Sequence, residues 1–218
     1  MTHMIIQPTD ILGVVDVQPT FMPGGDLPVP GGHEVVPVIN RLLAGPFAHA
    51  FATQDWHPPG HASFAATHGR EPYETVALHY GEQVLWPEHG VQNSPGAALH
   101  PELETARIAV TIRKGFHPGI DSYSAFFEND RRTPTGLDGY LRARGFHRIF
   151  LAGLATDFCV AWSAEDAVRL GYEVFVIEDA CRAIGLPTAD GRTTLDEARE
   201  RLHAAGVRFV QSESLVAP

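Results

Sequence analysis

Short runs of apolar residues recur along the chain, and most of them are continuous rather than alternating with polar residues. The first run is Ile11–Val15, and similar runs follow at 47–53, 108–112, 149–152, 174–177 and 207–210. Continuous apolar runs are typical of strands that are covered on both faces, as in a parallel sheet. The pattern therefore predicts six buried strands.

Amphipathic stretches separate these runs and predict helices. Apolar residues lie near helical spacing between Glu34 and Leu43. Three further stretches, at 137–144, 158–170 and 194–205, end next to a glycine that can serve as a C-cap, and Thr156 and Asp157 are candidate N-caps for the middle one. Strands and helices in alternation predict a three-layer α/β/α fold with a six-stranded parallel sheet.

Two connections are much longer than the others. They run from Gln54 to about Ala106 and from Gly115 to Gly136, and both contain His and aromatic residues. Long connections in a compact fold are usually functional or disordered. The aromatic content favours ordered loops that cover a site. Because the sequence contains no repeat, low-complexity tract or linker, we expect a single domain over residues 1–218.

Composition and charge narrow the range of partners. The chain has 218 residues, of which 44% are hydrophobic and 19% charged, and its formal net charge is −10. This charge argues against nucleic acid or an anionic membrane as a partner. The sequence has no bilayer-spanning apolar run and no N-terminal signal-peptide pattern. With only Cys159 and Cys181 as cysteines, a reducing, cytoplasmic location is expected.

Reactive side chains follow four of the predicted strands. Asp16 follows the first strand, Asp55 and His57 the second, Lys114 the third, and the turn that contains Cys159 the fourth. In an open parallel sheet, ligands bind outside the carboxyl ends of the strands. We therefore expect these five side chains to meet at one edge of the sheet.

Cys159 is the candidate nucleophile. It lies in the first turn of a predicted helix, where backbone N–H groups and the helix dipole favour a thiolate and can also form an oxyanion hole. The alternative is that Cys159 is a small buried apolar residue, which is the commoner role for a free cysteine. Cys181 follows the fifth predicted strand without such a helix start, and we interpret it as structural.

Asp16 and Lys114 supply the other groups that acyl transfer requires. A carboxylate at the end of a central strand is partly desolvated, which raises its pKa and suits it to accept a thiol proton. Lys114 can stabilise both the thiolate and this carboxylate. Taken singly, Asp16 is more often a cap or turn residue, and Lys114 is more often a solvated surface lysine. Together with Cys159 they form a nucleophile, a base and a cationic organiser.

Asp55 and His57 form the start of a candidate metal site. Residues two apart in an extended segment point to the same side, and a carboxylate with an imidazole suits Zn, Fe or Mn. His61 and His89 are available to complete the site. Because the chain has 12 histidines, a coincidental pairing is the alternative.

These residues occur in motifs that are similar to those of a known family. The chain resembles the nicotinamidase (pyrazinamidase) branch of the isochorismatase-like hydrolases. The matching segments keep the family order and span most of the chain; they are 15–18 with Phe21, 53–58 with 61–64, 86–89, 114–115 with 121–126, and 153–160.

The resemblance implies an activity and assigns a role to each residue. It implies hydrolysis of nicotinamide, and of pyrazinamide, to the acid and ammonia through a cysteine thioester, in NAD salvage. Its catalytic residues would be Asp16, Lys114 and Cys159. The metal ligands would be Asp55, His57 and His89, with His61 as a further ligand or a supporting group.

The resemblance also implies the details of substrate binding. The metal, zinc or else iron or manganese, would hold the ring nitrogen of the substrate. The family's cis peptide would join Leu154 to Ala155, and the amides of Ala155 and Cys159 would hold the oxyanion. The residues that line the pocket around the flat ring would be Phe21, Trp86 and Tyr123.

Three rival interpretations are weaker. An isochorismatase or another small amidase generally lacks the Asp55, His57 and His89 set. A nucleotide-binding module would need a G-x-G-x-x-G motif after the first strand, where Asp16-Val-Gln-Pro stands instead. A noncatalytic scaffold would not be expected to keep all three catalytic residue types. The sequence leaves a homo-oligomer open.

Overall fold

A six-stranded parallel sheet forms the centre of the molecule. This computed structural model describes residues 3–218. Met1 and Thr2, which begin the N-terminal stretch that has no signal-peptide pattern, lie outside the described residues. The strand order is β6-β3-β2-β7-β8-β9. The strands are β2 (Asp10–Val15), β3 (Ala50–Asp55), β6 (Ile108–Lys114), β7 (Arg148–Leu154), β8 (Glu173–Arg182) and β9 (Arg208–Val210). The predicted fold class is confirmed.

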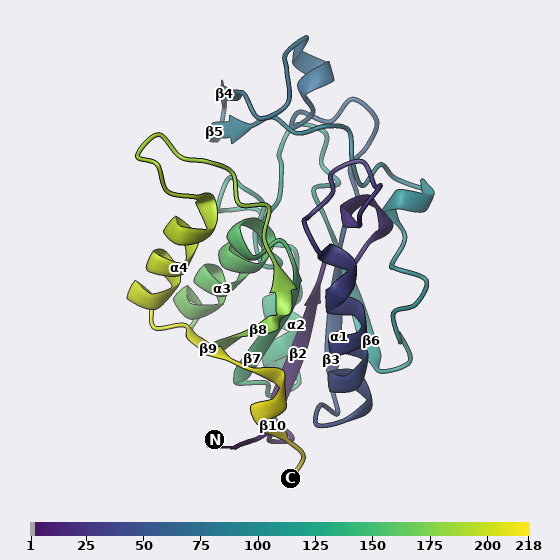
Figure 1. Ribbon diagram of the computed structural model, residues 1–218, viewed down its shortest axis with the longest axis vertical. Coiled ribbons are helices and arrows are strands. Elements are labelled where there is room, and N and C mark those ends of the chain that lie inside the picture. Colours follow the sequence, from purple (N-terminus) through teal and green to yellow (C-terminus); the bar gives the residue numbers. More distant parts are fainter. Residues whose placement is uncertain (1–2) are drawn as a thin grey trace.

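Helices cover the sheet on both faces, as the continuous apolar strands require. They are α1 (Val35–Ala44), α2 (Leu137–Ala143), α3 (Ala161–Arg169) and α4 (Thr194–Ala204). In Figure 1, α1 lies on the opposite side of the strands from α3 and α4. Every residue of β2 and of β3 is buried, which places the core around the two strands that lead to Asp16 and Asp55.

The long connections are ordered and lie beyond the carboxyl ends of the strands. The first contains a hairpin of β4 (Thr75–Leu78) and β5 (Gly81–Val84), at the top of Figure 1. At the opposite end of the molecule, β1 (Met4–Ile5) pairs with β10 (Leu215–Val216). Short 3-10 helices complete the structure at Pro19–Phe21, Gly32–Glu34, Ala65–His68, Pro95–Ala97 and Ser212–Ser214. Across residues 3–218, every helix is too short or too polar to span a bilayer.

The segment around Cys159 differs from its prediction. A π-helical turn covers Thr156–Val160, and α3 begins only at Ala161. The predicted N-caps are wrong, because Ala155 occupies the N-cap position of this turn and makes no side-chain cap. The carboxylate of Asp157 instead accepts hydrogen bonds from a later segment of the chain.

Cys181 also lies elsewhere than expected. It is inside β8 and not after it, because this strand continues through Arg182. The register of β8 against β7 shifts between Leu151 and Gly153, which accommodates the polar residues that seemed to mark the end of the strand. Cys181 is buried, and burial raises the pKa of its thiol to about 12. It therefore stays a protonated packing residue, in agreement with its structural interpretation.

Candidate active site

The ends of three adjacent strands bring the predicted polar residues together. Asp16 directly follows β2 in a left-handed conformation with φ 48°. Asp55 and Lys114 are the last residues of β3 and β6 and lie opposite each other in the ladder. All three side chains are buried. The expected convergence at one edge of the sheet is confirmed, and it excludes a solvated Lys114.

Lys114 links the candidate base to the candidate nucleophile. Its Nζ lies 2.8 Å from Asp16 Oδ2 and 3.3 Å from Cys159 Sγ. It also donates to the carbonyl of Ser122 at 3.0 Å and to Asp55 Oδ1. A buried ammonium with four such partners is fixed in place and is strongly favoured over the neutral amine.

The charges of this cluster follow from burial and from Lys114. Burial raises the pKa of Asp16, although Lys114 acts in the opposite direction. Burial alone would lower the pKa of Lys114, but Asp16, Asp55 and Cys159 together raise it well above its usual value. A carboxylate with a raised pKa is a better proton acceptor than an ordinary one.

Burial disfavours the thiolate form of Cys159. Burial raises its pKa well above the usual value, and this outweighs the opposite effect of Lys114. The start of the helix was expected to favour a thiolate, but the side chain is too desolvated for that position to suffice. A base that accepts the thiol proton is therefore needed. Asp16 has a carboxylate oxygen within 4.8 Å of Cys159 Sγ and is in position for that role.

Thr53 holds the candidate base in place. Its hydroxyl donates to Asp16 Oδ1 at 2.5 Å and accepts from the Asp16 N–H at 3.1 Å. Thr53 is on β3, next to β2 in the sheet. Nothing in the linear sequence marks this role, because it arises only when the two strands pair.

Asp55, His57 and His89 form a compact set of potential metal ligands. Asp55 Oδ2 lies 3.7 Å from His57 Nε2 and 3.5 Å from His89 Nε2. Each imidazole has its Nδ1 at 2.8 Å from a backbone carbonyl, that of Gly115 for His57 and that of Pro87 for His89. A carbonyl can only accept, so each Nδ1 carries the proton and each Nε2 presents a lone pair.

This arrangement fits a divalent cation. His57 Nε2 is buried and has no hydrogen-bond partner among residues 3–218. Burial would raise the pKa of Asp55, but its polar contacts, with Lys114 the strongest, lower it well below the usual value and keep the carboxylate ionised. Histidine ligands typically donate their other N–H to a carbonyl in the same manner. One carboxylate and two imidazoles suit zinc, iron or manganese.

His61 lies beside this set with both ring nitrogens already in use. Its Nδ1 is 2.8 Å from Ser63 Oγ, and its Nε2 is 3.0 Å from the carbonyl of His117 and 3.2 Å from that of Ile120. Burial lowers the pKa of His61 to about 4, so the ring is neutral. The ring packs against His57 with centroids 4.3 Å apart. This geometry suits a supporting group better than a ligand.

An apolar pocket opens onto Cys159 and Asp55. The three predicted residues, Phe21, Trp86 and Tyr123, all line it. Four further residues that were not predicted from the sequence also line it, and they are Leu27, Asp121, Phe158 and Ile184. Phe158 and Asp121 lie inside recognised motifs but received no role there, whereas Leu27 and Ile184 lie in loops that carry no chemical signal.

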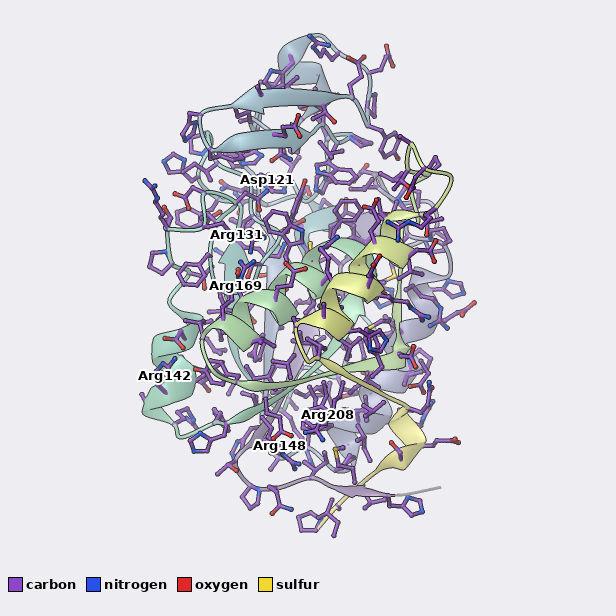
Figure 2. All side chains as sticks on the ribbon, turned by 90° about the vertical axis from the view of Figure 1, so that its left-hand side faces the viewer. Asp121, Arg131, Arg142, Arg148, Arg169 and Arg208 are labelled. Atoms are coloured by element: carbon purple, nitrogen blue, oxygen red, sulfur yellow. The ribbon has the colours of Figure 1, made fainter. Side chains whose placement is uncertain are left out.

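The aromatic wall of the pocket is held rigidly. Trp86 Nε1 donates to the Tyr123 hydroxyl at 3.0 Å. The Tyr123 ring packs edge-on against Trp162 of α3, with centroids 5.0 Å apart. The Arg131 guanidinium lies over the Trp162 ring, 3.7 Å from its centroid, and pairs with Asp166 at 2.6 Å. Figure 2 shows Arg131 close to Arg169 beside α3, where both contact Asp166.

Comparison with known proteins identifies the family of this chain. The family described as "Isochorismatase domain" matches residues 10–202. The chain belongs to the isochorismatase family. A nicotinamidase of Acinetobacter baylyi is 48% identical over 204 residues, which cover 93% of this chain and 92% of the relative. The relatives and the motifs confirm the resemblance inferred from the sequence, and the predicted cis peptide between Leu154 and Ala155 is present.

Solved structures of the family are also similar. An Acinetobacter baumanii nicotinamidase/pyrazinamidase has a TM-score of 0.90 at 48% identity, with 95% of this chain and 98% of that chain covered. PnC1 from L. infantum, in complex with nicotinate, has a TM-score of 0.85 at 39% identity, covering 99% of this chain and 100% of its own. A pyrazinamidase of Pyrococcus horikoshii, in complex with zinc, has a TM-score of 0.73 at 33% identity, covering 94% of this chain and 99% of its own.

Proposed function

We propose that this isochorismatase-family enzyme hydrolyses nicotinamide to nicotinic acid and ammonia, with Cys159 as the nucleophile. The observation that carries the proposal is the position of Lys114 Nζ, which contacts both Asp16 and Cys159, while Cys159 lines the apolar pocket. The relatives at 46–48% identity that cover most of the chain are nicotinamidases. Pyrazinamide, an isostere of nicotinamide, fits the same chemistry and is the expected second substrate.

In the first half of the reaction, Cys159 Sγ attacks the carboxamide carbon. Asp16 accepts the thiol proton as the C–S bond forms, and the carbonyl oxygen becomes a tetrahedral oxyanion. The backbone N–H groups of Ala155 and Cys159 stabilise this charge. Asp16 returns the proton to the nitrogen, the C–N bond breaks, and ammonia leaves behind a thioester on Cys159.

In the second half, water hydrolyses the thioester. Asp16 accepts a proton from the water as its oxygen attacks the thioester carbon, so that a second oxyanion forms at the same backbone N–H groups. The C–S bond then breaks, Cys159 recovers its proton, and nicotinic acid is released. Lys114 stays charged throughout, orients Asp16 and limits the charge that builds up on sulfur.

A divalent ion is part of the proposal. Asp55, His57 and His89 would hold it, with zinc as the preferred metal because a zinc-bound pyrazinamidase is among the similar structures. When bound, the ion would hold the ring nitrogen and thereby position the carboxamide. His61 would support this site through its contact with His57. Phe21, Trp86 and Tyr123 would enclose the ring. A role in NAD salvage and a cytoplasmic location, both expected from the sequence, are part of the same proposal.

The direct test is ammonia release from nicotinamide by the purified protein, with elemental analysis of the same sample. We expect turnover, and about one equivalent of a divalent metal per chain. Removal of the metal with a strong chelator should reduce kcat/KM, and addition of zinc, manganese or iron should restore it. Full activity of the metal-free protein would refute the positioning role of the ion, and no turnover of nicotinamide would refute the function.

A further inference from the structure

Asp157 connects the turn that carries Cys159, here called the nucleophile turn (residues 155–160), to a loop that lines the pocket. Its carboxylate is buried, although the residue lies two positions before Cys159. Oδ1 accepts from the N–H of Ile184 at 3.1 Å, and Oδ2 accepts from the N–H of Gly185 at 2.8 Å. Oδ2 also accepts from the Thr194 hydroxyl at 2.5 Å. The carboxylate therefore binds both ends of the loop between β8 and α4.

This loop supplies one wall of the substrate pocket. Ile184 lines the pocket together with Ala155, Phe158 and Cys159 of the nucleophile turn. The loop rises toward the β4–β5 hairpin, beyond the carboxyl ends of the strands (Figure 1). Ile184 is half-buried, and its backbone lies outside the sheet. Its position depends on the hydrogen bonds that hold the loop.

The structure lacks a cationic partner for Asp157. Among residues 3–218, no lysine, arginine or histidine pairs with this carboxylate. The carboxylate instead accepts from two backbone N–H groups and one hydroxyl, and these hydrogen bonds fix its direction as well as its distance. Thr194 strengthens the same contact, since its hydroxyl also accepts from the Leu186 N–H at 3.0 Å. Such a network specifies one loop conformation.

We propose that Asp157 is a positioning residue that holds Ile184 against the pocket, and that Ile184 limits which ring substituents the enzyme accepts. This inference rests on the proposed function, because it concerns substrates of the same site. Trp86 and Tyr123 are fixed by their own contacts, whereas the position of Ile184 depends on the tethered loop. Truncation of Ile184 would therefore admit a larger ring.

The test compares nicotinamide with nicotinamides that carry one methyl group at ring carbon 4, 5 or 6. The quantity measured is the selectivity ratio, which is kcat/KM for a methylated amide divided by kcat/KM for nicotinamide. Ile184→Ala removes enough volume for a methyl group, so the ratio should rise about tenfold for at least one isomer. Asp157→Asn replaces an acceptor by an NH₂ donor, so the same ratio should rise about threefold to tenfold and KM for nicotinamide should rise more than kcat falls.

A double-mutant cycle separates positioning from a general loss of stability. If Asp157 acts through Ile184, adding Asp157→Asn to Ile184→Ala should change the ratio less than about twofold. Asp179→Asn is the matched control, because Asp179 accepts from the Ser212 N–H at 2.8 Å and does not line the pocket. This variant should keep the wild-type ratio. If Asp157→Asn fails to fold, Thr194→Val removes one donor to the same carboxylate and should shift the ratio in the same direction.

Each outcome decides the proposal. Suppose that the wild-type enzyme is active and that Ile184→Ala leaves the selectivity ratio unchanged for all three isomers. This result would overturn the inference and leave the proposed function intact. If the two substitutions have additive effects on the selectivity ratio, Asp157 does not act through Ile184. That result would overturn the role of Asp157 and leave the role of Ile184 intact. If the wild-type protein releases no ammonia from nicotinamide, the proposed function fails and this inference falls with it.

Discussion

The Gln18 side chain pairs with the backbone of Asp55 in both directions. Its Oε1 accepts from the Asp55 N–H at 2.8 Å, and its Nε2 donates to the Asp55 carbonyl at 3.0 Å. Nε2 also donates to the carbonyl of Ala97 at 2.9 Å. The amide thus fixes the end of β3, and with it the carboxylate proposed to bind the metal.

Gln18→Leu should therefore weaken metal binding without removing a ligand. It leaves the Asp55 N–H and carbonyl buried without their partner, and loss of such a supporting contact typically costs 10–100-fold in metal affinity. Competition with a chromophoric chelator measures the change. Gln211→Leu is the control, since Gln211 is exposed and, within residues 3–218, its side chain bonds only to Glu178. Equal metal affinity of the two variants would contradict this account of Gln18.

Gly115 is required by the packing of His57. A Cβ at this position would lie 2.3 Å from His57 Cε1, and φ is +63°. Gly115→Ala should displace the imidazole and lower the metal content measured by elemental analysis, because only glycine adopts such a conformation freely. Gly119→Ala in the same loop is the matched control, since its Cβ would meet only His117 at 3.8 Å. A full metal content in Gly115→Ala would show that the ring can move without loss of binding.

His61 and His89 can be ranked by their contribution to metal affinity. His89 presents a free Nε2 toward Asp55, whereas both nitrogens of His61 contact protein groups. His89→Ala should therefore reduce the affinity for zinc more than His61→Ala, by about tenfold or more. Titration of the metal-free variants gives the order. The reverse order would exchange the assignments of the two residues.

Glu128 should make stability depend on pH. Burial raises the pKa of this carboxyl to about 7, from 4.5 for an ordinary glutamate. The folded state therefore binds the proton more tightly, so Glu128 contributes stability that is complete below about pH 4.5 and is lost as the pH rises through about 7. Between pH 5.5 and 7.5, the wild type should lose about 1–2 kcal/mol more unfolding free energy than Glu128→Gln. Urea denaturation at the two pH values measures this difference, and identical losses would refute it.

The strand ends were predictable because they combine apolar runs with the polar residues that follow them. Asp16, Asp55, Lys114 and the Cys159 turn all carry this local signal, and the parallel sheet brings them to one edge. The N-caps proposed at Thr156 and Asp157 were wrong because a tertiary contact replaced the local one. The Asp157 carboxylate accepts hydrogen bonds from Ile184, Gly185 and Thr194, which lie much further along the chain.

The pocket residues that lie in loops, such as Ile184, could not be predicted from the sequence in the same way. Ile184 reaches the site only because β8 extends through Arg182 and the following loop folds back. Its sequence neighbours give no periodicity and no chemical motif. Thr53 and Gln18 lie in recognised segments, but their hydrogen bonds to Asp16 and Asp55 depend on strand pairing and loop closure that a linear pattern does not encode.

The role of Cys159 is the central claim, and one comparison tests it most directly. Ammonia release from nicotinamide is measured for Cys159→Ala and for Cys181→Ala, with circular dichroism to verify that both variants fold. Cys159→Ala should lose activity by about 10³-fold or more, because no other group can form the thioester. Cys181→Ala should retain turnover, since that thiol is buried inside β8 away from the pocket. Folded Cys159→Ala that still releases ammonia at a rate close to that of the wild type would contradict the account.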